Sequence, residues 1–309
     1  MSVNSSAIQV GAPALPSDRA GLGWGLLGVA AFSLTVPLTR IAVADGGLSP
    51  LFVGSARAVG AALLAAIALT ATRQHLPRGT QWVRLAVVAA GVVIGFPILT
   101  SYALTTASAG HSAVVIALLP AATAVMAVLR GRERPARSFW VMAALGALAA
   151  VGFAVLSGGF TGLHGSDLLL FGAVLAGAVA YAEGGLLARE LGAWQTVSWA
   201  LVLAAPVMIV LTGVAVAGQA PVGTPAAWAA LGYLAAVSMY LGFFAWYRGL
   251  AIGPMTRVSQ VQLVQPVLTI GWAALLLHET LTWTILLGGA AVIACAAITV
   301  RVRSGPVPQ

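Results

Sequence analysis

The chain has 309 residues, of which 60% are hydrophobic and 7% charged, and its mean hydropathy is +1.00. A soluble globular domain carries about 25% charged residues, so the composition excludes that class and places the chain in a bilayer. The net charge of +8 comes from 15 arginines without a lysine, and Cys295 is the single cysteine, which excludes an intramolecular disulfide and a cysteine-based metal cluster.

Ten apolar stretches are each long enough for a transmembrane helix, which needs about 20 mostly apolar residues. They are apolar on every side and do not alternate, so they predict helices and not barrel strands. The segments between them are short, which leaves no room for a soluble catalytic or nucleotide-binding domain and excludes pumping driven directly by ATP in this chain. The predicted spans cover residues 23–44, 50–71, 81–102, 110–129, 138–157, 168–189, 194–217, 226–247, 255–277 and 281–301.

Arginine sets the predicted orientation of these spans. Twelve of the 15 arginines fall in the loops and tails on one side, and only Arg40 falls on the other side. The positive-inside rule therefore places both termini in the cytoplasm of a multi-pass protein of the bacterial inner membrane. Residues 1–20 lack the features of a signal peptide, so the first span is an uncleaved anchor. The positive net charge is explained by this orientation of the spans, so it does not indicate a nucleic-acid partner. We expect a monomer whose partners are the lipid bilayer and a small-molecule substrate.

Prolines interrupt several predicted spans, and Pro37, Pro120 and Pro266 are the candidate hinges. Each proline removes the hydrogen bond to the carbonyl four residues earlier and bends the helix. In hydrocarbon such a carbonyl must find another partner or face a cavity. Curvature that serves only packing is the alternative interpretation. The carbonyls concerned belong to Ser33, Ile116 and Gln262.

Two charged residues lie inside predicted spans. Arg57 falls about 10 Å below the outer surface by helical rise, where it would hold a substrate carboxylate or cap a neighbouring helix end. Glu183 lies deeper, too far away for a direct pair with Arg57. A bare carboxylate in a span is costly, so Glu183 is expected to be protonated, hydrated or paired. Three roles stay open for it: carrier of a coupling proton, ligand of a substrate ammonium, or a structural glutamate near the inner mouth.

Aromatic and amide side chains supply the remaining candidate substrate-binding residues. Phe32, Tyr181 and Tyr240 would offer flat surfaces for a planar ligand or an ammonium, although core packing explains any one of them equally well. The ninth span carries polar side chains at spacings of three, four and three, which put them on one stripe that should not face lipid. We expect this stripe to line a cavity, with bonding between helices as the alternative. Its members are Gln262, Gln265, Thr269 and Trp272.

The chain contains an internal repeat. Leu104, Pro120 and Glu133 recur as Leu250, Pro266 and Glu279 after 146 positions, and an earlier block recurs after 149. A duplicated unit with an odd number of spans inserts inverted relative to its twin, with the substrate site between the two. We predict a tail at 1–20, a first five-helix repeat at 21–157, an outer linker at 158–167, a second repeat at 168–302 and a tail at 303–309. The earlier block pairs Ala31, Phe32, Leu38 and Arg40 with Ala180, Tyr181, Leu187 and Arg189.

These residues carry a family resemblance. A five-span unit with a proline in its fourth span and a glutamate thirteen residues later, present twice, resembles the EamA-type branch of the drug/metabolite transporter superfamily over about residues 21–302. The resemblance implies an all-α membrane protein whose ten transmembrane helices form two inverted five-helix repeats around a central cavity. The Tyr, Trp and Gln content of spans six to nine is most similar to that of aromatic amino acid exporters of the YddG type. Arg57 departs from the repeat, because span seven has no basic counterpart.

The predicted function is export of amino acids, including aromatic ones, by a secondary transporter that works by alternating access. Other exporters of the same fold, for drugs or other metabolites, are the nearest alternative, because a fold does not fix a substrate. An intramembrane enzyme would need a catalytic cluster, for which only Glu183, Arg57 and His111 are available at different depths, and a passive pore is a further alternative. The sequence shows no motif for enzyme chemistry, and no cofactor or metal is expected.

Overall fold

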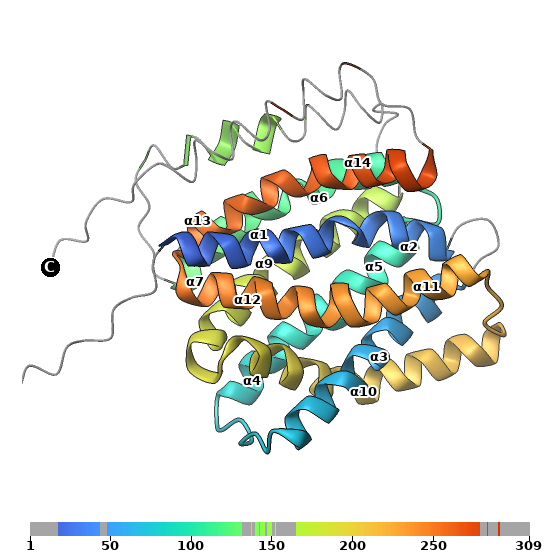
Figure 1. Cartoon of the computed structure of the whole chain (residues 1–309), viewed down its shortest axis with the longest axis horizontal. Coiled ribbons are helices and arrows are strands. Elements are labelled where there is room, and N and C mark those ends of the chain that lie inside the picture. The colour runs from blue at the N-terminus through green and yellow to red at the C-terminus, as the bar shows by residue number, and fades with distance from the viewer. Residues whose placement is uncertain are drawn as a thin grey trace, which may run out of the picture.

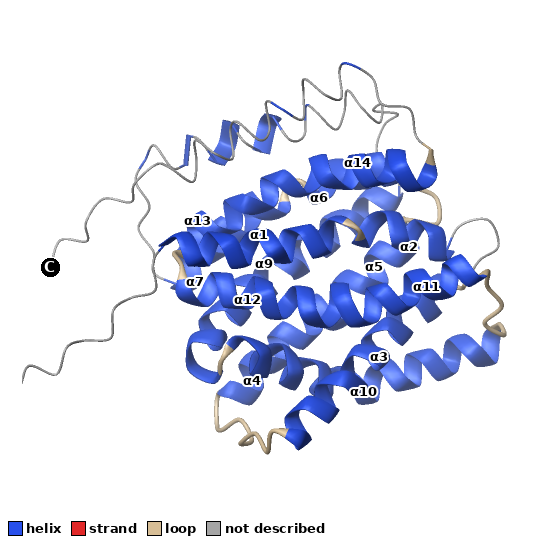
Figure 2. Ribbon diagram, viewed as in Figure 1, coloured by secondary structure: helices blue, strands red, loops and turns tan. Residues whose placement is uncertain are grey.

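The structure is a computed structural model that describes residues 18–43, 48–131 and 165–278, with a few isolated positions beyond them. Within these ranges every regular element is helical (Figure 2). Only scattered positions of the predicted spans over 138–157 and 281–301 are described, and Glu133 and Glu279 lie outside the described residues.

The described ranges contain eight of the predicted spans. Seven form helices that are long and apolar enough to cross a membrane, and the span predicted at 110–129 is divided into two shorter helices. Several spans are thus built from more than one element. In chain order the elements are α1 (Asp18–Ser33) and α2 (Thr35–Val43); α3 (Pro50–Ala71); α4 (Gln81–Val88), η1 (Ala89–Gly95) and α5 (Phe96–Ala103); α6 (Ala109–Ile116) and α7 (Leu119–Gly131); α9 (Gly165–Leu191); α10 (Ala193–Gly218); α11 (Pro225–Tyr233), η2 (Leu234–Leu241) and α12 (Gly242–Ile252); α13 (Met255–Gln260), η3 (Val261–Val264) and α14 (Gln265–Leu277).

Two spans begin with the same local signal. The Ser49 hydroxyl accepts a hydrogen bond from the Phe52 amide at 3.3 Å, and Pro50 is the first residue of α3. Thr224 caps α11 in the same way, with Pro225 as its first residue. A hydroxyl cap satisfies an amide that has no partner within the helix, and proline fits where no amide is needed. These pairs fix where both helices begin.

Helix breaks lie just before the three candidate hinge prolines. The helix is interrupted at Leu34 before Pro37, between α6 and α7 before Pro120, and by the 3-10 segment η3 before Pro266. The carbonyl of Ser33, which Pro37 deprives of its helical partner, accepts a hydrogen bond from the Thr269 hydroxyl of α14 at 2.9 Å. A side chain from the second half therefore satisfies a backbone group that proline frees in the first half.

The two halves exchange their first spans. The helix α1 packs along α12 and α14 of the second half, and α9 packs against α4, η1, α5 and α7 of the first half (Figure 1). The most extensive contact between the halves joins their second spans, α3 and α10. Each half thus completes the packing of the other, and the interior between them is shared.

Glycines allow α1 and α12 to touch backbone to backbone. A methyl group on Gly249 would lie 2.7 Å from the Gly25 amide nitrogen, and one on Gly21 would lie 2.9 Å from Gly253 Cα. Small residues at such positions bring membrane helices together, where burial from lipid supplies little driving force.

The repeated arginines make equivalent contacts at opposite ends of the bundle. Arg40 donates to the Leu104 carbonyl at 2.8 Å, and Arg189 donates to the Leu250 carbonyl at 3.3 Å. One end of the bundle contains Arg84, the start of α1 and the ends of α9 and α12, and we name it the Arg84 end. Arg40 and Leu104 lie at the other end, named the Arg40 end.

Candidate functional site

A cavity lies between the two halves, with an empty volume of about 530 Å³ that includes space open to solvent. Four polar side chains, Thr35, Thr39, Arg57 and Thr100, come from the first half, and Ser238 and Gln265 come from the second half. The apolar lining consists of Phe32, Val36, Val92, Phe96, Pro97, Leu104, Ile116, Leu119, Tyr181, Met239 and Phe243.

A smaller cavity of about 270 Å³ adjoins the first. Gln265 lines both, as do three apolar residues of the first half. The candidate hinge residues Pro120 and Pro266 and the stripe residues Gln262 and Thr269 belong to its wall. The two spaces together form one site, named the central cavity.

Irregular helices surround the central cavity. The π-helical segments η1 and η2 contribute Val92, Ser238 and Met239, and the broken fourth and ninth spans contribute Leu119 and Gln265. A π-helix places its carbonyls and amides one residue out of the α-helical register and recurs at functional sites. Irregular backbone at membrane depth is tolerated where it lines such a cavity.

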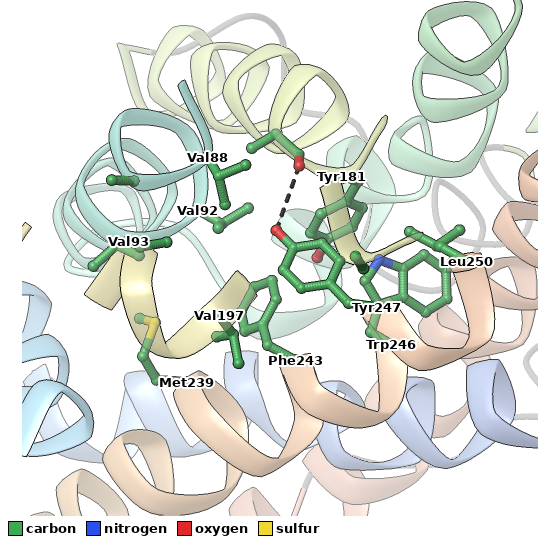
Figure 3. Close-up of a cluster of buried hydrophobic side chains, with 14 of the residues drawn as sticks. Val88, Val92, Val93, Tyr181, Val197, Met239, Phe243, Trp246, Tyr247 and Leu250 are labelled. Carbon is green, nitrogen blue, oxygen red and sulfur yellow. Dashed lines mark hydrogen bonds between the residues drawn. The ribbon is translucent and has the colours of Figure 1, made fainter. Parts of the chain in front are cut away.

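Aromatic rings close the cavity toward the Arg84 end. Phe32 and Tyr181 stack with ring centres 6.5 Å apart and planes 13° from parallel, and Phe243 lies 4.9 Å from Phe32. Trp246 and Tyr247 form the next layer, and the Tyr247 hydroxyl donates to the Ala180 carbonyl at 3.4 Å, the dashed line in Figure 3. The predicted aromatic surface of Phe32 and Tyr181 is therefore present in the cavity wall, with Phe243 as a third ring.

The stripe of the ninth span divides between the cavity and helix packing. Gln262, Gln265 and Thr269 line the central cavity, and neither amide atom of Gln262 has a hydrogen-bond partner. The Tyr181 hydroxyl lies near this amide without a bond of good geometry. Trp272 instead donates to the Ser33 hydroxyl at 3.0 Å and ties α14 to α1.

Tyr240 does not belong to the lining of either space. It packs against the aromatic core, and its hydroxyl shares a hydrogen bond with the Ser198 hydroxyl of α10 at 3.2 Å. Its role as a substrate contact stays a prediction, and the structure assigns it a bond between helices.

Glu183 lies outside the lining, toward the Arg84 end. Its side chain is 2% exposed and pairs with Arg84 and with Arg130, whose Nε lies 3.0 Å from Glu183 Oε2. Arg84 also pairs with the exposed Glu190. Of the three states expected for this carboxylate, the paired one is observed, and it connects α9 of the second half to α4 and α7 of the first.

Comparison with known proteins identifies the family. The model of the EamA-like transporter family matches residues 19–155 and again residues 164–301. The chain belongs to the EamA-like transporter family. It is similar to a Bacillus subtilis (strain 168) protein named "Uncharacterized transporter YdeK", with 43% identity over 289 residues, 90% of this chain and 97% of that protein. A solved structure titled "Crystal structure of protein" shares the fold, with a TM-score of 0.72 and 18% identity over 93% of this chain and all of that one.

Membership of the EamA-like family makes the chain a multi-pass membrane transporter of the drug/metabolite type and not an enzyme. Glu183 and Arg57 lie apart and have different partners. The side chain of His111 lies outside the described residues.

Several lining residues were not predicted from the sequence. Thr35 and Thr39 follow Phe32 at helical spacing, and this polar face was a signal that could have placed them in the cavity. Ser238 and Thr100 carried no such signal, because single hydroxyls are common in membrane helices. The partners of Glu183 were also missed, since Arg84 and Arg130 were assigned only to the charge of the inner loops.

Proposed function

We propose that this transporter exports amino acids, including aromatic ones, across the bacterial inner membrane, with the central cavity as the substrate site. The observation that carries the proposal is the composition of the cavity wall, in which Phe32, Tyr181 and Phe243 face a space that Gln265 and Arg57 also reach. Aromatic rings hold a flat side chain by stacking, and amides offer both donors and acceptors to a backbone zwitterion.

Alternating access is supported by the relation between the halves. The helix α1 begins, and α9 ends, at the Arg84 end, and each half inserts its first span into the other. We infer two inverted five-helix repeats, ten spans in all, acting as a monomer because one chain supplies both sides of the site. The arginine count places the Arg84 end in the cytoplasm together with both termini.

During transport the central cavity would open to water at one end of the bundle and then at the other. The candidate hinge prolines are the points at which the helices would bend. Pro37, Pro120 and Pro266 all follow helix breaks, and Pro120 and Pro266 line the cavity. At the cytoplasmic end, Glu183 holds α9 to α4 and α7 through Arg84 and Arg130. Its charge is balanced by these two guanidinium groups, so a coupling role at Glu183 requires the pairs to separate during the cycle.

Counterflow in proteoliposomes tests the proposal. Vesicles loaded with unlabelled phenylalanine should accumulate labelled phenylalanine transiently and with saturation, with and without a pH gradient. Glu183→Gln should abolish the response to the gradient but keep counterflow if Glu183 carries a proton. A flux that rises linearly without saturation would identify a pore and contradict the proposal, and counterflow of a lipophilic cation alone would make the protein a drug exporter.

A further inference from the structure

Arg57 is a buried cation in the cavity wall, and the described residues give it no counter-charge. It lies two turns into α3, its side chain is 1% exposed, and its Nε has no hydrogen-bond partner. Within the described part of the chain no carboxylate lies at ion-pair distance from it, and Glu183 and Glu190 are bound to Arg84 and Arg130. Among the described residues, those that line the central cavity include no aspartate or glutamate.

A single guanidinium in this position is expensive. Charged side chains inside a membrane protein pair with one another, reach water or mark a substrate pathway. Arg40 and Arg189 show the structural use in this same chain, because Arg40 is part-exposed, Arg189 is exposed, and each donates to two carbonyls at the end of a helix. Arg57, in contrast, is buried, donates to no carbonyl among the described residues, and lines the cavity.

One neighbour orients the Arg57 guanidinium. The Thr100 hydroxyl donates to the Phe96 carbonyl at 2.7 Å, which leaves its lone pairs for Arg57 Nη2 at 3.5 Å. This single long contact leaves Nε unpaired. The Thr39 hydroxyl, fully buried in the same wall, also lacks a partner. A guanidinium with an unpaired Nε and a hydroxyl without a partner therefore line the same cavity.

The polar region and the aromatic region lie at different depths. Phe32 and Thr39 are seven residues apart on the first span, which is roughly 10 Å along the axis. Arg57 contacts Thr100, one turn from Leu104 at the Arg40 end, whereas Phe32, Tyr181 and Phe243 close the opposite side. A ligand with an anionic head and a flat apolar tail matches this order.

We propose that Arg57 binds the carboxylate of the substrate and so makes the cavity selective for carboxylate-bearing solutes. The inference rests on the proposed function insofar as the central cavity is the substrate site. A guanidinium binds a carboxylate through two parallel hydrogen bonds, which a lysine ammonium cannot reproduce. Because the described lining offers the substrate ammonium no carboxylate and only neutral amides, hydroxyls and aromatic rings, we expect the ammonium to be dispensable and organic cations to be disfavoured.

The need for the carboxylate and the need for the ammonium can be separated by measuring the affinity of four related ligands for the wild-type protein in detergent. Phenylalanine has both charges, 3-phenylpropionate has only the carboxylate, and phenylalaninamide and phenethylamine have only the amine. The first two should bind, and the last two should bind at least about tenfold more weakly, since a hydrogen bond to a charged group contributes about 1.5–3 kcal/mol. Equal affinity for phenylalanine and phenylalaninamide would overturn the assignment of Arg57.

Variants locate the effect at Arg57. Arg57→Gln should weaken both carboxylate ligands by about 10- to 100-fold and remove the discrimination against the amide. Arg57→Lys, which keeps the charge, should retain part of the preference. Arg40→Gln removes an arginine outside the cavity and should leave the order of affinities unchanged. If Arg57→Gln does not fold, the ligand series on wild-type protein still decides.

The outcomes distinguish this inference from the function on which it rests. Binding of 3-phenylpropionate without phenylalanine would support Arg57 as the carboxylate ligand and contradict amino acid export. Binding of phenylalanine that Arg57→Gln leaves intact would support the export function and contradict the inference. Binding of neither carboxylate would contradict both.

Discussion

Single hydroxyl groups hold broken helices together in this protein. The carbonyl of Ser33 loses its helical partner to Pro37 and gains the Thr269 hydroxyl, and the Ser33 hydroxyl accepts from Trp272. A backbone carbonyl without a partner in an apolar interior costs as much as a lost hydrogen bond. One residue of α1 is thus the anchor for two residues of α14.

Thr269→Val tests this anchor. The variant keeps the shape of the side chain and removes the donor, so the Ser33 carbonyl is left buried without a partner. We expect a loss of about 1–3 kcal/mol of stability, seen as a lower melting temperature in detergent. Thr269→Ser should restore most of it. Thr70→Val is the matched control, because Thr70 is exposed and its hydroxyl bonds only to carbonyls of its own helix; equal melting temperatures for Thr269→Val and Thr70→Val would contradict the role of Thr269.

Residue roles could be predicted only in part. Glu183 was predictable as a paired, protonated or hydrated acid because charge inside a span is costly wherever the helix lies. Its partners were not predictable, because Arg84 and Arg130 meet it only after α4 and α7 pack against α9. Trp272 was expected to face the cavity from helical spacing and Tyr240 as an aromatic residue in the middle of its span. The rotation of each helix in the bundle decides whether such a side chain meets the cavity or a neighbouring helix.

At the scale of elements, the two halves repeat their irregularities as well as their residues. The shift of 146 positions, read from Leu104 and Leu250, also brings η1 (Ala89–Gly95) onto η2 (Leu234–Leu241) and the break between α6 and α7 onto η3. The matching irregular segments line the same cavity. A departure from α-helical geometry that occurs at both positions is best explained by a shared function at the cavity.

The contact of α1 with α12 gives a prediction at this scale. Gly249→Ala places a methyl group 2.7 Å from the Gly25 nitrogen and 2.9 Å from the Gly21 carbonyl oxygen, so the two helices must separate. We expect a loss of about 1–3 kcal/mol, measured by thermal unfolding in detergent.

Gly232→Ala is the control for that substitution. Gly232 lies in α11 with open space around it, so alanine should be neutral or stabilise the helix by up to about 1 kcal/mol. A Gly249→Ala protein as stable as the Gly232→Ala protein would show that the close approach is unimportant.

Element positions were largely predictable, and their interruptions were not. Eight predicted spans lie within a few residues of the observed ones, because length and hydropathy determine a transmembrane helix. The prolines indicated bends at 37, 120 and 266. The π-helical segment η2 (Leu234–Leu241) contains no proline, so its sequence predicts an ordinary apolar α-helix. Only packing around the cavity distinguishes this segment from an α-helix.

At the scale of the whole molecule, the exchanged first spans couple the halves. Movement of α9 changes the wall that the first half presents to the cavity, and movement of α1 changes that of the second half. The ion pairs of Glu183 connect helices at one end, and the contacts of Arg40 with Leu104 and Thr105 do so at the other. The bundle therefore has a central cavity with a separate set of contacts at each end, which is the arrangement that the proposed alternating access needs.

The measurement that tests this account most directly is the sidedness of thiol labelling at one cavity residue. In a Cys295→Ser background that retains counterflow, Ser238→Cys should react with a membrane-impermeant reagent added from either side, and phenylalanine should slow both reactions. His75→Cys, on the exposed loop between α3 and α4, should react from the cytoplasmic side only, at a rate that phenylalanine does not change. Modification of Ser238→Cys from one side alone, at the same rate with and without phenylalanine, would contradict a central substrate site with alternating access.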